Sequence, residues 1–248
     1  MSPVDAKEND AAGITQVLGQ PYLNVTGEGV VVGIVDTGID YTKPSFMRPD
    51  GSTKILGIWD QTAANGTGEG VPFGAAYTEE DINAALAASD PYSAVPETDE
   101  DGHGTFLASV AAGAAADGQT GAAPGASIVA VKLRRARSAY VSRFMLSPDD
   151  PALYESTDFM MGVKYVLDTA RDRGMPAVIC VGMGSNFSAH DGNTPLEEYL
   201  SFVSEMPGYA FVTAAGNESY ARRHTEGKID GTGAEARIGI RTASAGSS

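Results

Sequence analysis

The sequence predicts an α/β protein whose mostly parallel central sheet is flanked by helices. Short apolar runs bounded by glycines, typical of strands buried on both faces, alternate with amphipathic segments of helical length. Such alternation indicates parallel strands that are joined by crossover helices. The chain has 248 residues, 42% of them hydrophobic, which is enough to bury a large core in one domain or two.

Four apolar runs are expected to form strands of this sheet, because each is short and is bounded by turn-forming residues. Residues 30–35 make up the first run, Val-Val-Val-Gly-Ile-Val, which is continuous enough to be buried on both faces. The other three runs are residues 128–133, 177–181 and 209–213.

Two helices are expected between the last three strands. The first covers about residues 158–173, and its apolar face consists of Phe159, Val163, Val166 and Ala170. Ser156 or Thr157 can cap its start, and Gly174 ends it. The second opens with Thr-Pro-Leu-Glu at residues 194–197, a capping box with proline at the first helical position.

Other stretches lack this alternation. Residues 62–101, rich in alanine, glycine and acidic residues, are expected to form a surface excursion with one short helix near residues 79–88. Residues 138–155 are expected to be a loop insertion. Residues 228–233 are typical of a turn that enters a new β region.

Charge and composition exclude several classes of protein. The 17 basic and 32 acidic residues give a net charge of −15, and such a surface repels the phosphates of nucleic acids. No run of about 18 apolar residues is present, so no membrane span is expected. The first ten residues lack the pattern of a signal peptide. Cys180 is the only cysteine, which excludes an intrachain disulfide.

Two polar residues stand where α/β proteins place their ligands. Asp36 ends the first strand, and the carboxyl ends of parallel strands form the usual binding edge. His103 lies between two glycines directly before a helical run at residues 106–112. Each also fits a structural role, a simple Asp-Thr-Gly turn for Asp36 and a packed histidine for His103.

A third polar residue, Asn217, follows the strand at residues 209–213 after two alanines and a glycine. Its amide can donate a hydrogen bond to a developing oxyanion, and an Asx-turn is the alternative role. The three residues together, in this order and at these element ends, point to a catalytic site.

The motifs Asp36-Thr37-Gly38, His103-Gly104-Thr105 and Ala215-Gly216-Asn217 resemble the three successive signatures of the subtilisin-like serine proteases (subtilases, peptidase family S8). Residues 121–126 match the turn before the next strand of that family, and the resemblance covers residues 27–227. It implies a three-layer subtilisin-like fold. Further details resemble the subgroup of clostridial Csp-type germination proteases, namely residues 55–61, 184–186, 190–192, 217–218, His224 and Gly227.

The resemblance implies a role for each matching residue. Asp36 would orient the general base, His103 would be that base, and Asn217 would be the oxyanion donor. Two segments would bind substrate: the strand edge Gly182, Met183 and Gly184, and the wall of the first specificity pocket, Ala214, Ala215 and Gly216.

The family's nucleophile motif, Gly-Thr-Ser-x-Ala-x-Pro, is absent from the sequence. Residues 231–234, Gly-Thr-Gly-Ala, resemble it superficially but lie too close to Asn217 and precede no apolar helix. The strand edge departs as well, because Cys180 and Gly182 replace polar residues of the family pattern. The chain by itself is therefore expected to be inactive.

Two explanations fit the missing serine. In the first, residues 1–228 are the N-terminal portion of a catalytic domain, truncated before the nucleophile helix, and residues 229–248 begin a β-rich, jelly-roll-like insertion. The serine would then lie on the C-terminal remainder of the protein or on a second chain. The second explanation is a pseudoprotease that binds peptides or a partner. A nucleotide-binding protein is excluded. Gly27, Gly29 and Gly33 precede or interrupt the first strand, whereas the glycines of a phosphate-binding loop must follow the strand and open a helix.

The resemblance implies a peptide or protein substrate and no required cofactor. It also allows calcium, for which the acidic stretches 97–101 and 149–150 offer oxygen ligands, although clustered acids usually form a solvated surface. His190 and His224 are expected to support loops rather than bind metal, and Cys180 to be a core thiol. By resemblance the protein would be bacterial, autoprocessing, and extracytoplasmic or spore-associated.

Overall fold

The computed structural model describes residues 6–64, 70–116, 120–144, 153–185 and 191–217. The chain divides into two compact units, Met1–Ala214 and Ala215–Ser248. All helices and strands named below belong to the first unit, and residues 215–217 of the second unit are described. The β-rich insertion predicted at residues 229–248 lies outside the described residues and stays a prediction.

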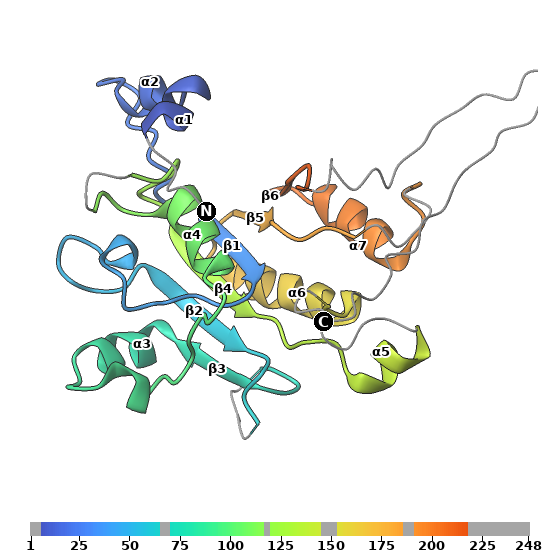
Figure 1. The fold of residues 1–248 in the computed structure, drawn as a ribbon. Coiled ribbons are helices and arrows are strands. Elements are labelled where there is room, and N and C mark those ends of the chain that lie inside the picture. Colours follow the sequence, from blue (N-terminus) through green and yellow to red (C-terminus); the bar gives the residue numbers. More distant parts are fainter. Residues whose placement is uncertain (1–5, 65–69, 117–119, 145–152, 186–190, 218–248) are drawn as a thin grey trace, which may run out of the picture. The chain divides into compact units, whose positions relative to one another are not determined.

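The described residues form a six-stranded sheet with the strand order β3-β2-β4-β1-β5-β6 (Figure 1). Neighbouring strands run parallel, except that β3 is antiparallel to β2. The strands are β1 (Val31–Asp36), β2 (Ile55–Asp60), β3 (Ala75–Thr78), β4 (Ser127–Lys132), β5 (Ala177–Val181) and β6 (Tyr209–Thr213). The predicted mostly parallel sheet is confirmed, and the four predicted strands match β1, β4, β5 and β6.

The strands β2 and β3 were not predicted. Because β3 lies within residues 62–101, the expectation that these residues form only a surface excursion is wrong, whereas the short helix expected near residues 79–88 is confirmed as Glu79–Leu86. Strand β3 is short, and long-range contacts hold it. It pairs with β2, and the indole of Trp59 on β2 donates a hydrogen bond of 2.8 Å to the carbonyl of Phe73. The same stretch contributes buried side chains to the core, among them Ile82 and Val95.

Helices cover both faces of the sheet, which gives three layers (Figure 1). The helices α6 (Ser156–Asp172) and α7 (Pro195–Ser204) pack on one face, and α3 (Glu79–Leu86) and α4 (His103–Ala112) pack on the other. The shorter helices are α1 (Ala6–Ala11), α2 (Ile14–Leu18), α5 (Ser138–Arg143), η1 (Pro44–Phe46) and η2 (Pro91–Ser93). None of the described helices has both the length and the apolar character needed to cross a membrane.

The central strand β1 supplies side chains to both cores. Val31 and Val35 pack in the core beneath α6, whereas Val32 and Ile34 pack in the core beneath α4. Successive residues of a strand point to opposite faces of the sheet, which accounts for this division. Asp36 follows the same alternation and therefore belongs to the α4 face.

The predicted helix ends are partly correct. Helix α7 begins with the expected capping box, in which Thr194 and Glu197 bond to each other's backbone N–H groups. Helix α6 is not capped by Ser156 or Thr157, because Glu155 is its N-cap and makes no side-chain cap bond. The Glu155 carboxylate is instead bound by Arg137. The predicted loop at residues 138–155 begins with the short helix α5.

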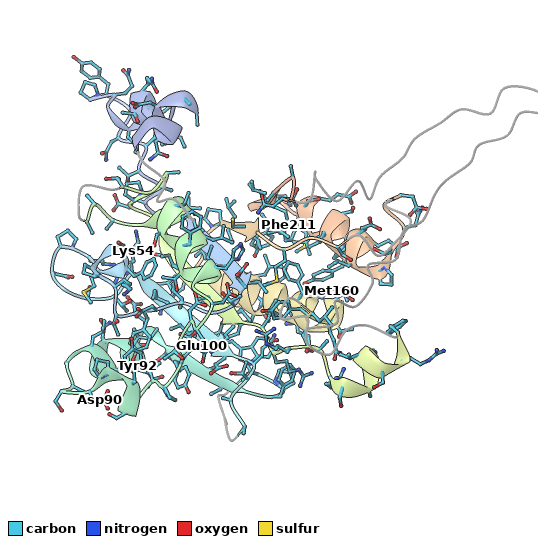
Figure 2. The ribbon with its side chains drawn as sticks, viewed as in Figure 1. Lys54, Asp90, Tyr92, Glu100, Met160 and Phe211 are labelled. Atoms are coloured by element: carbon cyan, nitrogen blue, oxygen red, sulfur yellow. The ribbon has the colours of Figure 1, made fainter. Side chains whose placement is uncertain are left out.

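Lys54 anchors the C-terminal end of α4 (Figure 2). The side chain is buried, and its ammonium donates hydrogen bonds of 2.5 Å to the carbonyl of Ala112 and 2.6 Å to that of Pro124. Ala112 is the last residue of α4, so the cation satisfies a carbonyl that the helix itself leaves unbonded. Burial lowers the pKa of Lys54 to about 8.

Glycine at position 33 allows α6 to pack closely on β1. A Cβ atom at Gly33 would lie 2.5 Å from Cγ1 of Val166, well inside contact distance. We expect Gly33→Ala to lower the free energy of unfolding by about 1–3 kcal/mol, because β1 and α6 would have to separate. Urea unfolding measures this. Gly184→Ala is the matched control, since nothing lies within 4 Å of its Cβ position, and equal losses in both variants would contradict the argument.

Candidate active site

The side chains of Asp36 and His103 meet at the carboxyl end of β1. Asp36 is the last residue of that strand, and His103 is the first residue of α4. The imidazole Nδ1 lies 2.6 Å from Oδ1 of Asp36. The carboxylate is 1% exposed and the imidazole 26% exposed, so the acid lies behind the base and the base borders solvent.

The side chain of Asp36 is almost completely buried. Burial raises the pKa of Asp36 and outweighs the hydrogen bonds from His103 and the Thr37 N–H, which lower it. Its other oxygen, Oδ2, is buried and has no hydrogen-bond partner among the described residues. A carboxylate Oδ1 only accepts hydrogen bonds, so Nδ1 of His103 must carry the proton that they share.

The opposite nitrogen of His103, Nε2, makes no hydrogen bond with any described residue. A neutral imidazole that is protonated on Nδ1 has an unprotonated Nε2 that accepts a proton. The arrangement is therefore an oriented general base with a buried carboxylate behind it.

Two glycines allow the backbone of the Asp36 turn to contact the start of α4. A Cβ atom at Gly104 would lie 2.2 Å from the carbonyl oxygen of Gly38. Gly38 has φ +130°, and its Cβ would lie 2.5 Å from Oε1 of Glu97. A side chain at Gly104 would separate the two motifs, so this glycine is required for the distance between Asp36 and His103, whereas a side chain at Gly38 would be strained and would displace Glu97.

Gly182 brings the end of β5 against the same pair. A Cβ atom there would lie 3.2 Å from Oδ2 of Asp36, 3.2 Å from Cε1 of His103 and 2.2 Å from Cδ1 of Leu107. Cys180, two residues earlier, is partly buried against the core beneath α4, and burial raises the pKa of its thiol. A thiol in this environment is a poor nucleophile.

The remaining predicted substrate residues directly follow the ends of the strands β5 and β6 in sequence. Met183 is partly buried against the core beneath α6, and Gly184 is exposed. Ala214 is exposed, and its N–H donates to the carbonyl of Val181 at 3.2 Å. In the second unit, Ala215, Gly216 and Asn217 are exposed, and Gly216 has φ +83°. The roles of these residues stay predictions, and His190 and His224 lie outside the described residues.

A cavity of about 580 Å³ opens at the carboxyl ends of β1, β2 and β4. Thr37 belongs to its wall, so the cavity reaches the Asp36 turn. Its other lining residues are Gln61, Thr62, Glu100, Asp101, Lys132, Leu133, Arg134, Arg135 and Tyr154. The end of a parallel sheet is the expected place for such a cavity.

The acidic stretch at residues 97–101 is solvated only in part: Glu100 and Asp101 are exposed, as the sequence predicts, but the other two acids are not. Glu97 is 0% exposed, and Asp99 is half-buried. Among the described residues no three histidine, cysteine or acidic side chains come together where they could hold a metal ion. The sequence patterns that identify Asp36 and His103 gave no sign of the buried positions of Glu97 and Asp99, because these depend on the fold.

Glu97 is a buried carboxyl beneath the Asp36 turn. Its Oε1 accepts the N–H of Ile39 at 3.1 Å, and its Oε2 has no hydrogen-bond partner among the described residues. Burial is the main cause that raises its pKa to about 8. The neutral form of this side chain is therefore the form that the fold favours.

Comparisons with known proteins agree with the geometry. The subtilase family matches residues 27–240 of the chain. The CspB protease of Clostridium perfringens is 32% identical, superposes with a TM-score of 0.73, and the match covers 86% of this chain and 41% of CspB. Sphericase is 24% identical, with a TM-score of 0.51 over 84% of this chain and 53% of that one, which supports the fold alone.

A curated relative gives the same family. The subtilisin-like protease SBT2.1 of Arabidopsis thaliana is 39% identical over 101 residues, which cover 35% of this chain and 11% of the relative. The chain thus spans less than half the length of CspB and a smaller share of SBT2.1.

The pKa of Glu97 in the folded protein lies above its usual value of 4.5. The contribution of Glu97 to the free energy of unfolding is therefore fully present below about pH 4.5 and is lost as the pH rises toward 8. Each pKa unit corresponds to about 1.4 kcal/mol. We expect Glu97→Gln to remove this loss, because the amide imitates the protonated carboxyl. Urea unfolding at several pH values measures the slope. Glu80→Gln, an exposed change on α3, should keep the wild-type slope, and an unchanged slope in Glu97→Gln would contradict the assignment.

Proposed function

Because this chain belongs to the subtilase family, we propose that it is the part of a serine endopeptidase that carries the acid and the base of the catalytic triad. The observation that supports this most directly is the 2.6 Å contact between Nδ1 of His103 and the buried Oδ1 of Asp36. The imidazole of His103 is partly exposed, so a serine hydroxyl and a peptide can approach it.

In this proposal His103 is the general base and Asp36 its orienting acid. Nε2 of His103 takes the proton of the serine hydroxyl as the serine oxygen attacks the peptide carbonyl. The resulting imidazolium then gives that proton to the leaving amine, and an acyl-enzyme forms. Water then attacks the acyl-enzyme as the same nitrogen takes its proton, and the imidazolium returns a proton to the departing serine oxygen, which releases the acid product and restores the free base. Asp36 stabilises the imidazolium through the Nδ1 hydrogen bond and fixes the ring orientation.

We assign Asn217 as the donor that stabilises the tetrahedral oxyanion. The backbone of Gly182, Met183 and Gly184 continues from the end of β5 and would pair with an extended peptide. Gly182 supports this role, because the absence of a side chain lets the backbone pass close to His103. Ala214, Ala215 and Gly216 would line the first specificity pocket, whose small residues leave room for the substrate side chain.

The nucleophilic serine is proposed to come from sequence outside this chain, either further along the same protein or on a second chain after processing. The chain contains no Gly-Thr-Ser-x-Ala-x-Pro motif. The same absence favours the second candidate function, a non-catalytic subtilase that binds a peptide or a partner protease. Retention of the Asp36 and His103 pair favours the protease, because a binding protein has no chemical need for an oriented base.

We expect His103→Ala in the complete protein to lower kcat by at least about 10³-fold, because the serine loses its base. Asp36→Asn should also lower kcat strongly. The double variant should cost little more than His103→Ala alone, since the two residues act as one unit. Steady-state hydrolysis of a peptide substrate measures this, and circular dichroism verifies folding. Unchanged turnover in His103→Ala, or fully additive losses, would contradict the proposal.

A fluorophosphonate probe locates the nucleophile. We expect denaturing mass spectrometry of the treated protein to find the adduct on a serine outside residues 1–248, on a longer chain or on a co-purifying one. The 25.6 kDa chain itself should remain unlabelled. Absence of any adduct, in a preparation that still binds peptide, would instead support the non-catalytic candidate.

A further inference from the structure

We propose that Asp99 is a positioning residue that holds His103 against Asp36. The inference rests on the proposed function, because the imidazole it positions is the proposed base. Asp99 lies four residues before His103 and is half-buried between the Asp36 turn and the start of α4.

The carboxylate of Asp99 accepts four hydrogen bonds. Its Oδ1 accepts from the hydroxyl of Thr37 at 2.8 Å and from the N–H of Gly102 at 2.9 Å. Its Oδ2 accepts from the N–H of Thr105 at 2.8 Å and from the hydroxyl of the same residue at 2.6 Å. These donors come from the two motifs that carry Asp36 and His103, so one side chain links both.

Each of the two threonine hydroxyls also accepts a hydrogen bond from the opposite segment. The Thr37 hydroxyl, next to Asp36, also accepts the N–H of Gly104 at 2.9 Å. The Thr105 hydroxyl, on α4, also accepts the N–H of Asp40 at 2.9 Å. The turn after β1 and the first turn of α4 are therefore bonded at two points, both directly after the Asp36 and His103 pair in sequence.

Asp99 also replaces the missing cap of α4. The N-cap residue of this ten-residue helix is Gly102, which has no side chain to accept the first N–H groups. Asp99 takes over the role of an N-cap side chain, because it accepts the N–H of Thr105 and puts a negative charge at the positive end of the helix. Burial opposes ionisation of Asp99, but the hydrogen bonds from Thr105, Gly102 and Thr37 outweigh it and lower its pKa.

The site requires a carboxylate. All four groups that face Asp99 are donors, and both hydroxyl protons are used toward it, so the hydroxyl oxygens are free to accept the N–H groups. Asparagine would place an N–H₂ group against at least one backbone donor. The start of α4 would then shift, and with it the short hydrogen bond between His103 and Asp36.

Four variants of the complete protein test this. Asp99→Asn removes the acceptor with little change in shape. Thr37→Val removes one link, and Thr37→Ser should restore it. Asp90→Asn is the matched control, because Asp90 caps the short helix η2 through the N–H of Tyr92 and makes no contact with either motif (Figure 2). The Thr37 pair keeps the test valid even when Asp99→Asn fails to fold.

The first readout is the ¹⁵N chemical shift of the His103 ring, assigned with His103→Gln. At about pH 9 the wild type should show the Nδ1–H tautomer. Asp99→Asn and Thr37→Val should shift the ring toward the Nε2–H tautomer, and Thr37→Ser and Asp90→Asn should not. If Asp99 and Thr37 merely stabilised the fold, their substitution would lower the unfolding midpoint and leave this tautomer unchanged.

The second readout is the division between kcat and KM. We expect kcat to fall about 10- to 100-fold in Asp99→Asn and Thr37→Val, with KM changed by less than about twofold. Wild-type tautomer and kcat in both variants would overturn the positioning role and leave the proposed function intact. If Asp36→Asn also left the His103 ring shifts unchanged, the proposed function would fail, and this inference with it.

Discussion

The direct contact of two backbone segments, the turn after β1 and the first turn of α4, is the constraint on which the site depends. Gly38 and Gly104 permit this approach, because a Cβ at Gly104 would lie 2.2 Å from the carbonyl oxygen of Gly38. Helix α4 is also held at its two ends, by Asp99 at its start and by Lys54 at its last residue. A helix fixed at both ends gives the imidazole at its first position a defined direction.

Three carboxyl groups in this small region differ in their burial and in the number of their hydrogen-bond donors. Asp99 accepts four bonds, and its pKa is lowered although it is half-buried. Asp36 has two donors and Glu97 one, each with an unpartnered oxygen among the described residues, and burial raises the pKa of both. Asp99 has the most donors and is the least buried of the three, and both differences lower its pKa relative to the pKa values of Asp36 and Glu97.

Much of the fold could be predicted from local pattern, and the rest depends on contacts between distant residues. The strands β1, β4, β5 and β6 and the capping box of α7 are visible as apolar runs and short motifs. The strand β3 is not, because its pairing with β2 defines it. For the site, resemblance led to Asp36 and His103, whereas the burial of Glu97 and Asp99 follows from the path of the chain around them and leaves no mark in their own sequence.

The alternation of side chains along β1 has a further consequence for how the protein can change. Val31, Gly33 and Val35 face α6, whereas Val32, Ile34 and Asp36 face α4. Insertion or deletion of one residue in this strand would send the carboxylate to the face opposite the imidazole, whereas a change of two residues would keep it on the same face. The length of β1 is therefore restricted by parity, a constraint on insertions and deletions that is separate from stability.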